Sequence, residues 1–260
     1  MKLTWFDANS WLVEAGGLRI LVDPWLVGDL VFGDMPWFVR GVRPEPIDIP
    51  PDIDLILLSQ GLPDHAHPET LQQLDKSIPV MASPDGAKVA RKFGYASVTA
   101  LDHGDTVNWG KANELTIQTF IGAVVGATKR ENGYVLTFAA EGVRLYYEPH
   151  GYPDNQHLKD IGPVDVVITP MADIRLMKVA PVIRGHVAAP EVARLLKPQV
   201  MLPTAENGRV TYEGLISSAL TTSGGAEELR SQLEAQGVRV VKPASGEPVE
   251  LDLRSTASVS

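Results

Sequence analysis

The 260-residue chain contains no cysteine and only six histidines. Without cysteine it can form neither disulfide bonds nor any zinc site that depends on thiolate ligands. A transition-metal site in this sequence must therefore use imidazole and carboxylate groups. The imidazoles come from His65, His67, His103, His150, His157 and His186.

Positive charge and long hydrophobic runs are also scarce. The 23 basic residues are outnumbered by 32 acidic ones, giving a formal net charge of −9, and this balance argues against a nucleic-acid partner or an anionic membrane surface. No apolar run approaches the roughly 18 residues of a transmembrane helix. The acidic Asp7 and Glu14 make the N-terminal stretch unlike a signal peptide. We therefore expect a cytoplasmic protein without a transmembrane segment.

Strand and helix patterns alternate along the chain. Continuous apolar runs predict strands buried on both faces at 54–59, 164–170 and 199–204. Hairpin-like strand patterns occur at 3–6, 10–15, 18–22, 114–120, 133–140 and 142–148. Helical patterns begin at 68 and span 84–94, 190–198 and 226–237. This order favours an α/β fold, a four-layer αββα sandwich with two mixed β-sheets flanked by helices, in a single domain over residues 1–253. Residues 254–260 are expected to be a flexible polar tail.

Residues 25–53 have a different character, because prolines and glycines interrupt a strongly apolar stretch that includes Trp25, Trp37 and Phe38. A long loop this apolar needs a surface to bury against. Two interpretations remain open: a flap packed on the body of the protein, or a lid over an apolar ligand site.

The stretch SQGLPDHAHPETL concentrates an acid and two histidines between a predicted strand and a predicted helix. Asp64 and His65 are candidate metal ligands, while His67 precedes Pro68 and is expected to cap the helix. His150, in the turn YYEPHG, follows another buried strand. Since ligands bind at the ends of strands in such sheets, we expect a site role for His150 as metal ligand or acid–base group.

In its order of motifs the chain resembles the metallo-β-lactamase superfamily, in particular its lactonase-like, metal-dependent hydrolase branch. The matching stretches are LTWFDANSWLVEAGGLRILVDPWL, DLILLSQGLPDHAHPETL, YYEPHG, VDVVITP and EVARLLKPQVMLPT. The resemblance implies an αββα sandwich whose site lies at one edge, between the two sheets, and holds one or two metal ions, usually zinc.

The expected ligand motif departs from the superfamily pattern His-x-His-x-Asp-His. The aligned stretch is Gln60-Gly-Leu62-Pro-Asp64-His65, so the first two histidines are missing. Leucine has no lone pair and a neutral amide is a poor ligand for zinc. His150 falls at or near the place of the superfamily's bridging aspartate, and Ala205 or a neighbour falls at the place of its final histidine. The resemblance therefore implies a degenerate metal site, with at most one ion on Asp64, His65 and His150 and with His67 or His186 as a further ligand or supporting group.

Three functions remain open. The first is a mononuclear metal-dependent hydrolase of an ester or lactone, with one zinc or manganese ion on Asp64, His65 and His150. The second is a pseudoenzyme, a metal-free binding or assembly protein that holds an apolar small molecule under the 25–53 loop. The third is metal-free acid–base catalysis by His65 and His150, with Asp64 as the orienting group. Whether the protein is an enzyme therefore stays open.

The residues that replace metal ligands suggest a dry cavity for an apolar or amphipathic small molecule. We expect it to be lined by Gln60, Leu62, Trp25, Trp37, Phe38 and His186. A protein partner or a homo-oligomer is compatible with the apolar loop.

Overall fold

The computed structural model describes residues 1–125 and 129–254, and it contains two seven-stranded β-sheets packed face to face. The first sheet contains, in spatial order, β20 (Pro248–Glu250), β1 (Lys2–Trp5), β2 (Trp11–Ala15), β3 (Leu18–Val22), β6 (Leu55–Leu58), β7 (Val80–Ala82) and β8 (Val98–Ala100). The strands β1, β2 and β3 are antiparallel, whereas β3, β6, β7 and β8 are parallel.

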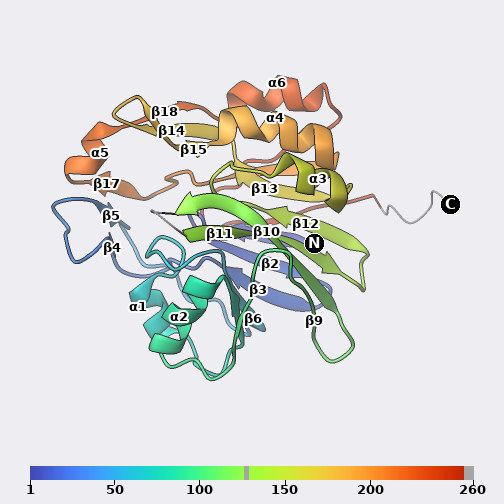
Figure 1. The fold of residues 1–260 in the computed structure, drawn as a ribbon, viewed down its shortest axis with the longest axis horizontal. Coiled ribbons are helices and arrows are strands. Elements are labelled where there is room, and N and C mark those ends of the chain that lie inside the picture. The colour runs from blue at the N-terminus through green and yellow to red at the C-terminus, as the bar shows by residue number, and fades with distance from the viewer. Residues whose placement is uncertain (126–128, 255–260) are drawn as a thin grey trace.

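The second sheet is mixed in the same way. Its spatial order is β19 (Arg239–Val240), β16 (Val200–Thr204), β13 (Val166–Pro170), β12 (Val143–Tyr147), β11 (Lys129–Phe138), β10 (Leu115–Val125) and β9 (Thr106–Trp109). Helices α1 (Pro68–Gln73) and α2 (Pro84–Lys92) cover the outer face of the first sheet, and α3 (Asn155–Ile161), α4 (Gly185–Leu196) and α6 (Ala226–Glu234) cover the second (Figure 1). The expected four-layer αββα sandwich is confirmed.

Three apolar layers hold the sandwich together. The central one lies between the sheets and includes the buried rings of Trp5, Trp11, Tyr134, Phe138 and Tyr147. A second layer joins α3, α4 and α6 to their sheet, and a third joins α1 and α2 to theirs. Strands such as β6 and β13 are buried on both faces, which explains why the sequence shows them as continuous apolar runs.

Two small sheets lie outside the sandwich. One pairs β4 (Leu30–Val31), β5 (Arg40–Val42) and β17 (Thr211–Glu213), and the other pairs β15 (Ala180–Arg184), β14 (Ala172–Leu176) and β18 (Leu220–Gly224). The short helix α5 (Leu215–Ala219) connects β17 to β18 at one end of the molecule (Figure 1). The sequence patterns predicted none of these six strands and did not predict α5.

The 25–53 segment is anchored on the body of the protein by Trp25. Its ring is fully buried beside Tyr212 and under the Arg43 guanidinium, 4.9 Å from the ring centroid. Gly41 is required there, because a Cβ at that position would lie 2.6 Å from the Trp25 ring. The packed-flap interpretation therefore holds for this part of the segment.

Two further expectations concern the chain as a whole. No helix within the described residues is both long enough and apolar enough to cross a membrane. Residues 255–260 of the expected polar tail lie outside the described part of the chain.

Candidate metal centre and its pocket

Asp64, His65 and His150 come together at one edge of the sandwich. Asp64 and His65 lie in the loop that follows β6, and His150 lies in the turn that follows β12, so the cluster joins the two large sheets. One nitrogen or oxygen from each side chain lies within 4.8 Å of the others, and the two imidazole centroids are 5.2 Å apart. We call these three residues the metal cluster. Among the described residues it is the one group of acids and histidines with spacing suited to an ion.

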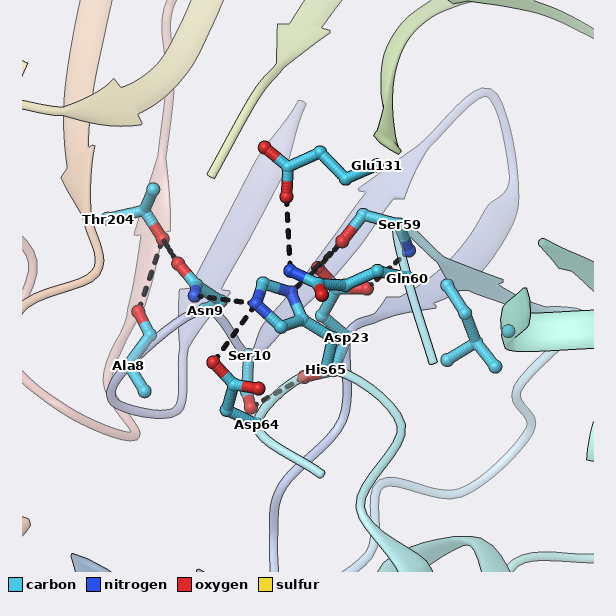
Figure 2. Close-up of polar contacts among 12 residues, drawn as sticks. Ala8, Asn9, Ser10, Asp23, Ser59, Gln60, Asp64, His65, Glu131 and Thr204 are labelled. Atoms are coloured by element: carbon cyan, nitrogen blue, oxygen red, sulfur yellow. Dashed lines mark hydrogen bonds and ion pairs between the residues drawn. The ribbon is translucent and has the colours of Figure 1, made fainter. Parts of the chain in front are cut away.

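The His65 ring is fully buried and held from both sides (Figure 2). Its Nδ1 lies 2.7 Å from an oxygen of Asp23, and its Nε2 lies 3.2 Å from an oxygen of Asp64. Asp23 is itself fixed by hydroxyl donors, since Ser59 Oγ and Tyr147 Oη each donate to it at 2.6 Å. These contacts on both nitrogens restrict rotation of the ring, and its Nε2 faces Asp64.

His150 has a matching carboxylate partner. Its Nδ1 lies 2.7 Å from Oε2 of Glu131, a fully buried residue of β11, and Gln60 Nε2 donates to the same oxygen at 3.2 Å. The carboxylate of Glu148 accepts the backbone N–H groups of His150 and Gly151 at 3.1 and 2.6 Å, which shapes the turn. In both histidines of the cluster, Nδ1 is thus paired with a buried carboxylate.

The carboxylates and imidazoles of the cluster shift one another's pKa values in opposite directions. Burial alone would lower the pKa of His65, but the carboxylates of Asp64 and Asp23 outweigh it and hold that pKa well above its usual value. Burial would raise the pKa of Asp64, but His65 and His150 outweigh it and lower that pKa. Glu148 differs, because burial and the adjacent Glu131 raise its pKa well above its usual range.

The residues present fit a metal ion. Oδ1 of Asp64 is buried and has no hydrogen-bond partner, although a buried carboxylate oxygen normally has one. Imidazole nitrogen and carboxylate oxygen are ligands that zinc and manganese accept. Carboxylates on the far nitrogen of ligating histidines are a common supporting arrangement, because they fix the ring and raise its basicity.

A pocket of about 510 Å³ opens onto Asp64 and His150. The small outer sheets, the loop between β4 and β5, and α5 supply most of its surface. We call their apolar lining residues the apolar wall: Leu30, Phe32, Phe38, Ile174, Leu176, Val182, Ile183, Ile216 and Leu220. None of the described residues that line the pocket is lysine or arginine. A ligand here meets a mainly apolar surface with a few polar groups at the cluster end.

Only one of the six predicted substrate-binding residues lines this pocket, namely Phe38. Trp25 is buried in the packed flap, and Trp37 is 65% exposed outside the lining. Gln60 and Leu62 border a separate hollow of about 170 Å³.

The remaining histidines have other neighbours. The backbone N–H of His186 donates to Asp173 at 2.9 Å, and its ring packs against Gly224 of β18. His67 caps α1 as expected, with its Nδ1 accepting from the Thr70 N–H group. Neither residue belongs to the metal cluster.

Sequence reasoning missed the supporting carboxylates Asp23 and Glu131. A signal existed for Asp23, which directly follows the apolar strand β3, whereas nothing in the local pattern marks Glu131 as buried in the structure. Asp23, Ala8 and Ala205 also adopt positive φ angles of 43°, 47° and 58° around the site. Such backbone costs on the order of 1–3 kcal/mol per residue and tends to cluster at functional sites.

Comparison with known proteins agrees with this architecture. Residues 2–205 match the family model described as the β-lactamase superfamily domain. A curated protein of Chelativorans sp., named a metal-dependent hydrolase, is 26% identical over 176 residues, which cover 64% of each chain. This chain therefore spans slightly less than two thirds of that relative's length.

Solved structures share the fold at low sequence identity. A possible metal-dependent hydrolase from Veillonella parvula has a TM-score of 0.72 at 13% identity, with 96% of this chain and 99% of the other covered. An isothiocyanate hydrolase from Delia radicum gut bacteria has a TM-score of 0.69 at 17% identity, with the same coverage. At such identities the likeness establishes the fold alone.

Proposed function

Because the chain belongs to the metallo-β-lactamase superfamily, we propose that it is a metal-dependent hydrolase with a single ion on Asp64, His65 and His150. The observation that carries this proposal is the converging geometry of the cluster, with three ligand atoms within 4.8 Å of one another and one buried Asp64 oxygen without a partner. Three protein ligands that leave a coordination position open are typical of catalytic zinc sites.

Each residue of the site has a distinct task in this proposal. A bound zinc or manganese ion would polarise a carbonyl and lower the pKa of a water molecule. Asp23 and Glu131 keep the two imidazoles in place through their Nδ1 atoms. Asn9, whose Nδ2 lies 3.5 Å from His65 Nε2 and which also borders the pocket, is positioned to orient a polar group of the substrate.

The pocket favours an uncharged ester or lactone that carries an apolar group. A substrate carboxylate that lies against the apolar wall would find no cationic side chain among the described lining residues. Burying such a charge without a partner costs several kcal/mol or shifts its protonation. An alkyl or aromatic group, by contrast, gains about 25 cal/mol for each Å² of apolar surface that it buries.

A second candidate is a metal-free binding protein for the same class of ligand. It is favoured by Gln60, Leu62 and Ala205, which stand where the superfamily pattern leads one to expect histidines. In that case the pocket would be the functional feature, and the cluster would persist as a hydrogen-bonded brace.

Elemental analysis of protein purified without chelator separates the two candidates. We expect about one zinc or manganese ion per chain, loss of that ion in His150→Ala, and retention of it in the control His157→Ala, because His157 lies on α3 outside the cluster. Hydrolysis should be assayed with p-nitrophenyl esters of increasing chain length, with an ω-carboxylated analogue, and with an aromatic isothiocyanate. A metal content near zero that added zinc and manganese cannot restore would reject the hydrolase and leave the binding protein.

A further inference from the structure

The hairpin of β10 and β11 is built to accommodate the side chain of Glu131. The pairing register shifts between Ile121 and Val124, which marks a bulge beside Gly122. Bulges of this kind are common next to active sites, where they redirect a side chain. Gly122 leaves room for the carboxylate, because a Cβ there would lie 2.5 Å from Cγ of Glu131.

Both oxygens of this carboxylate are occupied by donors. Oε1 accepts the backbone N–H of Ala123 at 3.0 Å, while Oε2 accepts from Gln60 Nε2 at 3.2 Å and lies 2.7 Å from His150 Nδ1. A carboxylate is only an acceptor, so the short contact requires the proton of His150 to be on Nδ1. The lone pair of Nε2 is then the one available to a metal ion.

The backbone around His150 is fixed independently of its ring. Glu148 accepts the N–H groups of the turn, and the carbonyl of His150 accepts the Arg184 N–H at 3.0 Å. These bonds set where the side chain starts but not how the imidazole is rotated or which nitrogen carries the proton. The contact with Glu131 is the one described hydrogen bond of the ring itself.

We infer that Glu131 is a positioning residue for the metal centre: it holds His150 as the Nδ1–H tautomer and points Nε2 at Asp64 and His65. The bulge at Gly122 and the amide of Gln60 serve to place the Glu131 carboxylate. This inference rests on the proposed function for its purpose, but the tautomer can be measured whether or not the protein binds a metal.

The substitution Glu131→Gln tests the role of the carboxylate with little change in shape. An amide has a single oxygen, so it cannot accept from both Ala123 N–H and His150 Nδ1–H, and the ring loses its fixed tautomer. The ¹⁵N chemical shifts of the His150 ring in metal-free, histidine-labelled protein should show Nδ1–H in the wild type and a mixture in the variant. Zinc affinity, measured by competition with a chelating dye, should fall by about 10–100-fold.

Two more variants separate position from general destabilisation. Glu114→Gln is the matched control, because Glu114 lies just before β10, at the end of the hairpin away from the bulge, and contacts its own turn through Ala112 N–H. It should leave the His150 shifts and the zinc affinity unchanged. Gly122→Ala keeps the charge of Glu131 but displaces it, and should therefore reproduce the changes seen in Glu131→Gln.

The outcomes are distinguishable from failure of the hydrolase proposal. A wild-type protein that binds no metal but shows a fixed Nδ1–H tautomer supports the positioning role and rejects the hydrolase. An Nε2–H tautomer in the wild type, or the wild-type tautomer retained in Glu131→Gln, overturns the inference, as does a zinc affinity within twofold of wild type in a protein that binds zinc.

Discussion

The metal cluster and the apolar wall face the same pocket but are attached to the fold in different ways. Asp64, His65 and His150 follow strands of the large sheets, and the buried carboxylates of Asp23 and Glu131 tie the two histidines to the core. The apolar wall comes from the small outer sheets and from α5, where many side chains are only half-buried. In the proposed function, the metal ligands would thus depend on the buried core, whereas the ligand contacts would come from less buried segments.

The contrast predicts a large stability cost at the cluster. Asp23→Ala leaves His65 Nδ1, the Ser59 hydroxyl and the Tyr147 hydroxyl without their common acceptor. Removing one member of such a buried charged network costs about 3–5 kcal/mol of unfolding free energy. Urea denaturation of the variant should show this loss.

Glu45→Ala is the control for that measurement, because Glu45 is exposed in the 25–53 segment. It should change the unfolding free energy by no more than about 0.5 kcal/mol. If Asp23→Ala and Glu45→Ala lowered the unfolding free energy equally, the buried network at the cluster would contribute no more to folding than an exposed loop residue.

A substitution in the apolar wall should have a different effect, because it should weaken ligand binding without loss of the metal ion. Leu176→Asp places a carboxylate at a half-buried position of the pocket lining. The uncharged apolar dye Nile red should bind at least about tenfold more weakly, since roughly 1.5–3 kcal/mol of apolar contact is lost there. Metal content should stay at the wild-type value.

Val179→Asp provides the matched control on the same hairpin, because Val179 is 76% exposed and outside the lining. It should leave dye binding unchanged. A loss of dye binding in Val179→Asp, or a loss of metal in Leu176→Asp, would erase the distinction between the two regions.

The sandwich and the metal cluster follow from patterns that a sequence displays directly. Buried strands such as β6 and β13 are continuous apolar runs, and the cluster residues lie in the loop and the turn that follow β6 and β12. The turn at His150 has to meet the loop at His65 once both strands end at the same edge of the fold. Local periodicity together with the resemblance was sufficient for this much.

The apolar wall could not be predicted in the same way. The strand β15 (Ala180–Arg184) is largely exposed and β18 is rich in threonine and glycine, so neither shows the alternation of a half-buried strand. Glu131 was missed because its partner, His150, is distant in sequence and its position depends on a bulge. Hydrophobicity alone also could not separate the buried Trp25 from the exposed Trp37.

The smallest expected effect concerns two neighbouring aromatic residues that the sequence treats alike. Phe38 lines the pocket, while Trp37 is 65% exposed. The two rings meet edge-on, with their centroids 5.8 Å apart. Trp37→Ala should therefore change the unfolding free energy by less than about 0.5 kcal/mol and leave Nile red affinity within twofold of wild type. Phe38→Ala should weaken the dye by roughly tenfold, because it removes apolar contact area from the pocket. If Trp37→Ala instead weakens the dye as much as Phe38→Ala does, the indole closes over bound ligand, and the 25–53 segment is a lid as well as a packed flap.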